Sequence, residues 1–442
     1  TKGRLACSVL AVSVWEDQMK QLKYVAAIAA TLCATSASAW QATEGKPYAG
    51  ETVHVLAVKS SQFEAQEARL PTFEKATGIN VVVDYVPFPS MKEALTTEMI
   101  AGGNYDVVSI MDQWVPSLKN LVQPIGDEIA KQGVDLSNYP KAFLRHGYLD
   151  NKLVGLPVRG HVQLLFYRKD LLEKAGVGVP QTWDDVVSAS KAIQDTSGVS
   201  GIALPYGKLN GQNLMVWINL LWGHGGKLFD ASGAPSFNSD AGVAATEQYV
   251  GFLTKDKIAP SGSATFVEQD AVNSFKQSNS AMLTTWWWVR SQLTDPEQSK
   301  VADDQLGFAP MPSVGDAPRT TFTNTWIFSI TKGSRNKDAA AEYLGWLTDP
   351  ALERDILLDP SLSEVVAVHF SNMRDPEVNK RWGGMHAAAA KTLETAEGMD
   401  FGENWPRISE ILETTISSLA SGAETDTSAA LDHAADEIKR IR

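Results

Sequence analysis

Three consecutive tryptophans, Trp286-Trp287-Trp288, are the side chains best suited to recognising a small molecule. An indole has a broad apolar face and an N–H that needs a partner, so in a cleft it suits a flat ligand with polar edges, such as a sugar ring or a polyol. The triplet ends a run expected to be a strand, on which successive side chains point to opposite faces. We therefore predict that Trp286 and Trp288 face a ligand and that Trp287 packs inward. The alternative is that all three rings pack in a core or an interface.

Arg159 and His161 form a second polar group, because they alternate with apolar residues on a segment, 158–167, that reads as a buried strand. Polar groups inside such a strand must find partners, and the edge of a cleft would supply them. None of the seven histidines has a second one at the helical spacing of metal ligands. We expect His161 to be a hydrogen-bonding group rather than a metal ligand or a base.

The elements that position these groups are strands alternating with helices. Strands are predicted at 52–58, 79–85 and 105–111, with a helix at 60–76 and another opened by a capping box at Ser90. This alternation predicts a parallel sheet covered on both faces, with ligand groups at the carboxyl ends of its strands. The residues at those ends are Ser60, Ser61, Gln62, Asp112, Gln113 and Trp114.

The rest of the chain continues the mixed pattern. A hairpin is expected with its turn at Asp150-Asn151, and further strands at 200–205 and 325–331. Helices are expected at 169–175, 182–195, 213–223, 238–254, 270–277, 336–347, 406–419 and 427–441.

Length and charge restrict the class of protein. A chain of 442 residues fits two domains of ordinary size. Its formal net charge of −13 argues against nucleic acid and anionic membranes as partners.

The N-terminal residues read as a processing segment. Met19 is followed by Lys20 and Lys23, an apolar run at 24–33, and Ala37-Ser38-Ala39, which has the form of a signal-peptidase site. We expect residues 1–18 to be upstream sequence, residues 19–39 to be a signal peptide, and cleavage to follow Ala39. The exported chain would then carry a net charge of −15, because residues 1–39 hold four Lys or Arg and two Asp or Glu.

Several catalytic chemistries have no candidate residues. Both cysteines, Cys7 and Cys33, lie in the segment expected to be removed. The sequence contains no Gly-x-Ser-x-Gly, His-Glu-x-x-His or P-loop motif. We therefore expect no catalytic residue, no metal site and no cofactor.

Five stretches resemble the extracellular solute-binding proteins of carbohydrate ABC importers, the maltose-binding-protein-like family 1. They are 73–81 with Tyr105-Asp106-Val107-Val108, 156–171 with Pro180-Gln181-Thr182-Trp183, Gly225-Gly226-Lys227-Leu228-Phe229, 280–286, and 334–344. Each is weak alone, but their order and spacing over residues 50–350 make the likeness specific.

The resemblance implies an α/β fold of the two-lobed periplasmic-binding-protein type (type II), with a ligand cleft between the lobes and hinge closure. Lobe one would be 50–158 plus 325–357, and lobe two 160–322 plus 360–442. The partners implied are the permease subunits of an ABC importer, and we expect a monomer.

The resemblance also adds site residues. It implies that Gln212, Asn213 and Trp217 also contact the ligand. They add to the residues already named, which are those at the strand ends, Arg159, His161 and the tryptophan triplet. His161 stands where the maltose binder has a carboxylate, which argues against a maltodextrin. The C-terminal part departs from the family pattern, so Asn404 and Trp405 are included without a motif behind them.

The predicted site mixes Trp, Asn, Gln, Asp, Arg and His, and planar polar groups beside indoles favour a neutral polyhydroxylated ligand. We predict a periplasmic protein that binds a small neutral carbohydrate or sugar alcohol without changing it and delivers it to an importer. The alternatives are a binder of another solute, such as a polyamine, an anion or a metal, and a secreted glycosidase, which needs two facing carboxylates.

Overall fold

The structure, a computed structural model, describes residues 40–399 and 401–441. The chain divides into a unit ending at Trp40 and a unit from Gln41 onward, and the fold presented here is that of the second unit. The predicted signal peptide and its cleavage site lie outside the described residues. Within those residues, no helix has the length and apolarity that a membrane span requires.

A mixed sheet runs through the unit in the strand order β2-β1-β3-β10-β6-β8-β7, and β9 also pairs with β6. Its strands are β1 (Thr52–Val58), β2 (Asn80–Val86), β3 (Val107–Met111), β6 (Leu156–Arg168), β7 (Ser200–Ala203), β8 (Ser280–Trp286), β9 (Leu306–Ala309) and β10 (Thr323–Ile330). The first three strands are parallel, as predicted. The sheet is mixed rather than wholly parallel because β10 runs antiparallel between β3 and β6.

Strand β6 joins the two halves of this sheet. Its first half pairs with β10, whereas its second half pairs with β8 and β9. The predicted lobe boundary at 158–160 falls inside β6, and the one at 322–325 falls at the start of β10. The α/β class is confirmed, and the division into lobes at these residues stays a prediction.

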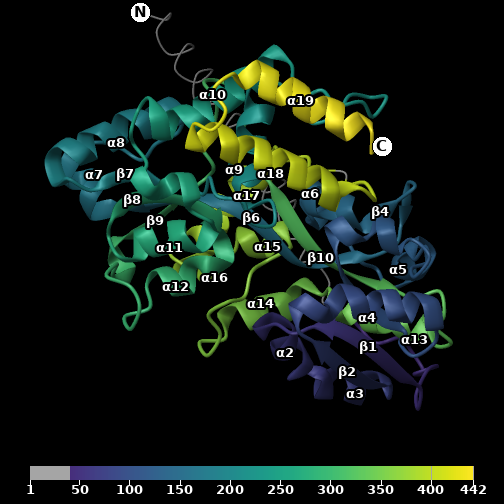
Figure 1. Ribbon diagram of the computed structural model, residues 1–442. Helices are drawn as coiled ribbons and strands as arrows, with labels where there is room; N and C mark the ends of the chain where they lie inside the picture. The colour runs from purple at the N-terminus through teal and green to yellow at the C-terminus, as the bar shows by residue number, and fades with distance from the viewer. Residues whose placement is uncertain (1–39, 400, 442) are drawn as a thin grey trace, which may run out of the picture. The chain divides into compact units, whose positions relative to one another are not determined.

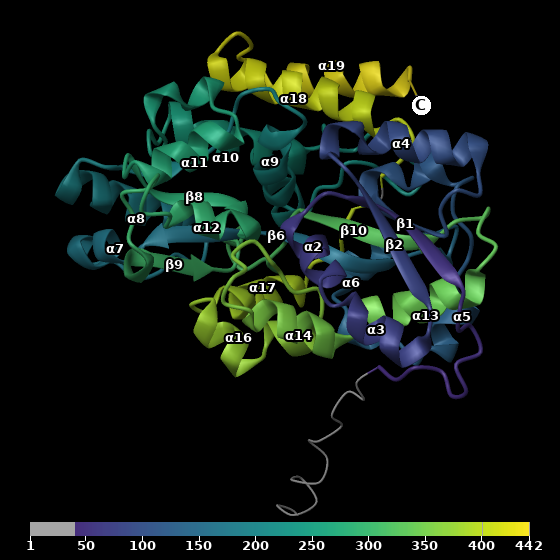
Figure 2. The same ribbon diagram turned by 90° about the horizontal axis from the view of Figure 1, so that it is seen from below.

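Helices cover both faces of the sheet. In the half that contains β1, α4 (Phe88–Ala101) lies on one face and α13 (Lys337–Leu347) on the other (Figure 2). The remaining helices are α2 (Ser61–Glu67), α3 (Leu70–Thr77), α5 (Gly126–Lys131), α6 (Lys141–Leu144), α7 (Lys169–Ala175), α8 (Trp183–Ser197), α9 (Gln212–Gly223), α10 (Asp240–Thr254), α11 (Glu268–Lys276), α12 (Arg290–Leu293), α14 (Pro350–Leu358), α15 (Phe370–Met373), α16 (Pro376–Arg381), α17 (Met385–Leu393), α18 (Trp405–Ser421) and α19 (Thr427–Lys439). The predicted hairpin is the strand pair β4 (Tyr148–Leu149) and β5 (Lys152–Leu153).

Two local predictions are wrong because of prolines. The single helix expected at 60–76 is broken into α2 and α3, since Pro71 has no N–H and its ring would clash with the carbonyl four residues earlier. Helix α4 begins at Phe88, with Pro89 in its first turn, so Ser90 lies inside the helix and does not cap it. The helix predicted to begin at 182 is confirmed as α8, where Thr182 and Asp185 form a complete capping box.

The C-terminal helices α18 and α19 lie side by side, with α18 against α9 (Figure 1). The apolar stripe predicted for 406–419 is buried, with Ile408, Leu412 and Ile416 at most 2% exposed. This packing brings the first turns of α18, from Trp405 to Glu413, next to the first turn of α9.

Candidate ligand-binding site

A cavity of about 840 Å³ lies where β6, β8, β10 and the end of β3 meet the first turns of α9 and α18. This volume is in the range of small-molecule sites. Seven of the predicted site residues line it, namely Gln113, Trp114, His161, Gln212, Trp286, Trp288 and Trp405. We call it the large chamber.

Strand register explains which side chains face the large chamber. His161 on β6 lies opposite Asn324 on β10, and Arg159 lies opposite Trp326. Residues directly opposite each other share a face, as do residues two apart on one strand. These four side chains therefore lie on one side of the sheet.

Aromatic rings make up much of the wall. Phe88 stacks on Trp114 with ring centres 5.7 Å apart, and Trp326 stands at 90° to Trp114 at 5.6 Å. Phe401 and Trp405 pair at 5.4 Å. Apolar faces thus line the chamber from β10, α4 and α18.

The tryptophan triplet is divided between the chamber and the interior. Trp286 and Trp288 line the chamber and flank His161, with ring centres 6.0 and 6.4 Å from its imidazole. Trp287 is fully buried, and its Nε1 donates to the Gly160 carbonyl at 3.0 Å. The three rings point as predicted. The reason is not the alternation of side chains along a strand, on which the prediction was based. Strand β8 ends at Trp286, and Trp287–Val289 forms a 3-10 turn.

Two amide side chains on the wall have orientations set by their partners. The backbone N–H of Glu268 donates to Gln212 Oε1 at 2.9 Å, which leaves the Gln212 amino group free to donate to a ligand. Asn324 Nδ2 donates to Asp112 Oδ1 at 2.8 Å, which leaves the Asn324 carbonyl oxygen to accept. The chamber therefore presents one fixed donor and one fixed acceptor.

Three ionisable groups of the chamber, His161, Glu268 and Glu413, are held neutral or already accept a hydrogen bond. Burial, together with the nearby Arg159 charge, lowers the pKa of His161 well below its usual value, so the imidazole is neutral. Burial raises the pKa of Glu268, against the opposing effect of a hydrogen bond from Thr285 at 2.7 Å. Glu413 accepts from the Gly211 backbone N–H at 2.7 Å.

A smaller cavity of about 300 Å³ holds three more of the predicted residues, Ser60, Ser61 and Arg159. His161 and Trp288 line both cavities. We call this one the small chamber.

Five predicted residues line neither chamber, namely Gln62, Asp112, Asn213, Trp217 and Asn404. The two that follow strands have structural partners instead. Gln62 Nε2 donates to two carbonyls, those of Val158 and Val366, each at 3.1 Å. Asp112 accepts from Asn324 and also from the Thr325 backbone N–H at 2.8 Å, so it ties the end of β3 to β10.

The other three residues also have structural partners. Asn213 is fully buried and its amide donates to the Glu413 carbonyl at 2.9 Å, which joins α9 to α18. Trp217 lies on the opposite side of α9, where Nε1 donates to Thr246 Oγ1 at 2.7 Å. Asn404 donates to the Ile441 carbonyl at 2.8 Å, away from both chambers.

The sequence prediction missed several residues of the large chamber, among them Phe88, Glu268, Phe322, Asn324, Trp326 and Phe401. Asn324 and Trp326 flank the start of the strand predicted at 325–331, and period-two alternation puts them on one face. Only the pairing with β6 shows that this is the face of Arg159 and His161.

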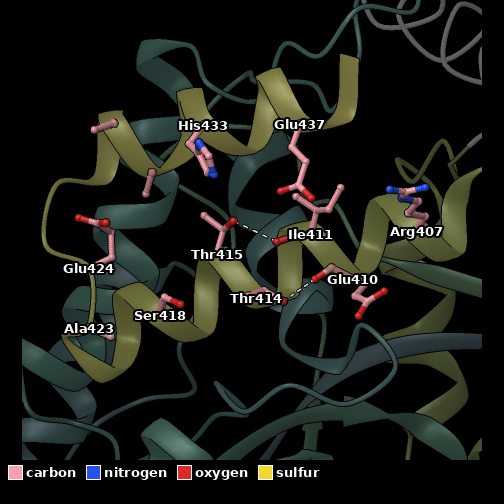
Figure 3. Close-up of a pocket in the computed structure, with 12 residues that line it drawn as sticks. Arg407, Glu410, Ile411, Thr414, Thr415, Ser418, Ala423, Glu424, His433 and Glu437 are labelled. Carbon is pink, nitrogen blue, oxygen red and sulfur yellow. Dashed lines mark hydrogen bonds between the residues drawn. The ribbon is translucent and has the colours of Figure 1, made fainter. Parts of the chain in front are cut away.

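A groove of about 570 Å³ lies between α18 and α19 (Figure 3). Its threonine hydroxyls fold back onto their own helix, since Thr414 donates to the Glu410 carbonyl at 2.7 Å and Thr415 to the Ile411 carbonyl at 3.0 Å. No Phe, Tyr or Trp lines this groove. The aromatic and amide groups are gathered instead in the large chamber, which is the better candidate site. Among residues 40–399 and 401–441, no group of three His, Cys, Asp or Glu is placed to hold a metal ion.

Comparison with known proteins identifies the family to which the chain belongs. A family model described as bacterial extracellular solute-binding protein matches residues 58–353. A probable amino-acid ABC transporter periplasmic-binding protein of Sinorhizobium fredii is 31% identical over 349 residues, which are 76% of this chain and 77% of that protein. The mannitol-binding protein of Pseudomonas aeruginosa is 28% identical over 59% of this chain and 60% of its own length.

Solved structures show the same fold. The sugar-binding protein MalE of Xanthomonas citri superposes with a TM-score of 0.77 at 22% identity, over 88% of this chain and 97% of that one. A solute-binding protein of Agrobacterium radiobacter K84 in complex with ribitol gives a TM-score of 0.71 at 24% identity, over 90% of this chain and all of that one. Both are similar in fold to this chain.

Proposed function

Because the chain belongs to the family of bacterial extracellular solute-binding proteins, we propose that it binds a small neutral carbohydrate or sugar alcohol in the large chamber. It holds this ligand without chemical change and delivers it to the permease subunits of an ABC importer.

The observation that carries this proposal is the pairing of aromatic faces with a fixed donor and a fixed acceptor. Trp286 and Trp288 offer apolar faces to the C–H side of a polyol, while Gln212 donates and Asn324 accepts. A hydroxyl group both donates and accepts, so a polyol satisfies both amides without a charge.

The relatives differ in the ligands that their names record. One is named as a probable amino-acid binder and another as a mannitol binder, and one solved relative contains ribitol. The large chamber favours the polyols, because its neutral imidazole and its aromatic walls offer little to a zwitterion. Lys208, one of its cations, is already paired with Glu410 at 3.5 Å.

A glycosidase needs an acid and a second carboxylate facing one bond. Each carboxylate of the chamber is committed elsewhere, Glu268 to Thr285, Glu413 to Gly211 and Glu410 to Lys208. These commitments support binding without turnover.

The remaining parts of the proposal follow from family membership. We propose export to the periplasm with cleavage after Ala39, two lobes bounded as predicted, and closure about the β6 and β10 crossovers. We also propose that the protein is a monomer and does not bind nucleic acid.

A thermal-shift screen of residues 40–442 tests the proposal, with mannitol, ribitol, glucose, maltose, free amino acids and polyamines as ligands. A ligand at 100 times its dissociation constant stabilises the folded state by about 2.7 kcal/mol, a readily measured shift. We expect the shift with at least one neutral polyol or sugar. A shift confined to amino acids or polyamines contradicts the proposal.

Single substitutions then locate the ligand. Trp286→Ala and Trp288→Ala should each weaken binding by roughly tenfold or more, since each removes an aromatic face. Tyr148→Ala is the matched control, because this aromatic is exposed on the β4–β5 hairpin and lines neither chamber. Equal affinities for all three variants and the wild type would place the ligand elsewhere.

A further inference from the structure

Three residues that line the small chamber each carry one buried polar atom with no hydrogen-bond partner in the described structure, namely Ser61 Oγ, Arg159 Nε and His161 Nδ1. Leaving a buried polar atom unpaired costs about 1–3 kcal/mol, so such atoms are rare. Three of them on the residues of one cavity indicate that a bound molecule supplies their partners.

These atoms lie directly beside the large chamber. Arg159 and His161 are two residues apart on β6 and therefore point to the same side of the sheet. His161 and Trp288 line both chambers. A ligand that fills the large chamber can therefore extend one of its ends past them into the small one.

Three charged side chains line the small chamber, namely Lys59, Arg159 and Glu364, and Lys59 is paired with Glu64 at 3.7 Å. Within the described part of the chain, Arg159 makes no ion pair at 4 Å or less. Glu364 lines the same chamber and acts on Arg159 only at longer range. Burial lowers the pKa of Arg159 to about 10, so it keeps its proton at neutral pH.

The donors of Arg159 and Ser61 determine which ligand group can bind in the small chamber. Arg Nε–H can only donate, and the serine hydroxyl can donate, so the partner must be rich in acceptors. A carboxylate brings two acceptor oxygens and the negative charge that Arg159 lacks. A neutral hydroxyl would satisfy one bond and leave the buried charge uncompensated.

We propose that the preferred ligand is a polyhydroxylated carboxylate, an aldonic or uronic acid, whose carboxylate enters the small chamber against Arg159 and Ser61. Its hydroxylated carbons occupy the large chamber between the aromatic walls. This inference rests on the proposed binding of a polyhydroxylated ligand in the large chamber, and it differs from the proposed function in giving the preferred ligand a negative charge.

Matched ligand pairs test the inference by isothermal titration calorimetry at fixed ionic strength. The pairs are gluconate with glucitol, and galacturonate with galactose, which differ at the carboxylate. We expect the acid of at least one pair to bind roughly 10- to 100-fold more tightly, the range of a charge-assisted hydrogen bond. Equal or tighter binding of both neutral members overturns the inference and leaves the proposed function intact.

Single substitutions test whether the preference for the acid arises in the small chamber. Arg159→Met should abolish the preference for the acid, bringing its affinity to that of the neutral partner, and Ser61→Ala should lower the affinity for the acid alone. Lys92→Met is the control, because it removes a cation from the large chamber only. If Arg159→Met does not fold, Ser61→Ala carries the test.

The outcomes separate the two claims. If Lys92→Met rather than Arg159→Met or Ser61→Ala removes the preference, the carboxylate does not lie in the small chamber and the inference is wrong. If neither member of any pair binds but a free amino acid does, both the inference and the proposed function fail.

Discussion

His386 lies behind the tryptophan triplet, and neither of its ring nitrogens has a hydrogen-bond partner among the described residues. It is fully buried on α17, 5.1 Å from the Trp287 ring and 5.5 Å from the Trp382 ring. Burial, reinforced by the nearby charges of Arg290 and Arg381, lowers its pKa from 6.5 to about 3. We predict that this residue makes the protein less stable in mild acid.

Proton linkage gives the sign and the size of the change in the free energy of unfolding. Below pH 6.5 the unfolded chain takes up a proton at this histidine and the folded chain does not, so the free energy of unfolding falls as pH falls. Between pH 7.5 and 5 the loss from this one group is about 2 kcal/mol.

Urea denaturation of wild type and His386→Met at pH 7.5 and 5 isolates this contribution. Methionine is apolar and adaptable in a core, and it removes both unpaired nitrogens, so the variant should already be more stable at pH 7.5. Its advantage should grow by about 2 kcal/mol at pH 5. The pKa shifts of Asp112, Glu268 and His161 are shared by both proteins and cancel in the comparison. An advantage that stays constant across these pH values refutes the reasoning.

Two further predictions concern the cavity wall and its support. Asn324→Leu should lower ligand affinity roughly tenfold, because it removes the fixed acceptor, and calorimetry beside a melting curve checks this; a lower melting temperature with unchanged affinity would show that Asn324 supports the fold alone. Gly160→Ala should lower the free energy of unfolding by about 1–3 kcal/mol, because a Cβ there would lie 2.3 Å from the Phe143 ring in a close-packed core. Wild-type stability in urea denaturation would contradict this.

Much of the fold follows from local patterns in the sequence. The strand at 52–58 and the start of the helix at 182 are each decided by neighbouring residues, and the structure agrees with both predictions. Pro71 is also a local signal, because it marks the start of a new helix. The prediction of one helix over 60–76 followed the amphipathic pattern on both sides of Pro71 instead.

The site was less predictable, because it depends on which strands pair. Asn324 and Trp326 enter the chamber through the register of β10 against β6, which links residues more than 150 apart in the chain. The polar residues that follow strands show the converse case, because they were predicted as ligand contacts and line neither chamber. Gln62 and Asp112 lie where ligand groups are expected, but both hold backbone together. Composition alone does not separate a polar group that binds ligand from one that joins two strands.

In the small chamber, the unpartnered atoms of Arg159 and Ser61 are compatible with the carboxylate of a sugar acid or of an amino acid. The amides of the large chamber, which we propose to bind hydroxyl groups, favour the sugar acid.

A crystal structure of the protein with the tightest ligand of the screen tests the central claim most directly. We expect the ligand in the large chamber, with its C–H face against Trp286 or Trp288 and hydroxyls within hydrogen-bond distance of Gln212 Nε2 and Asn324 Oδ1. A ligand bound outside this chamber, or one that contacts neither amide nor either indole, would contradict the account.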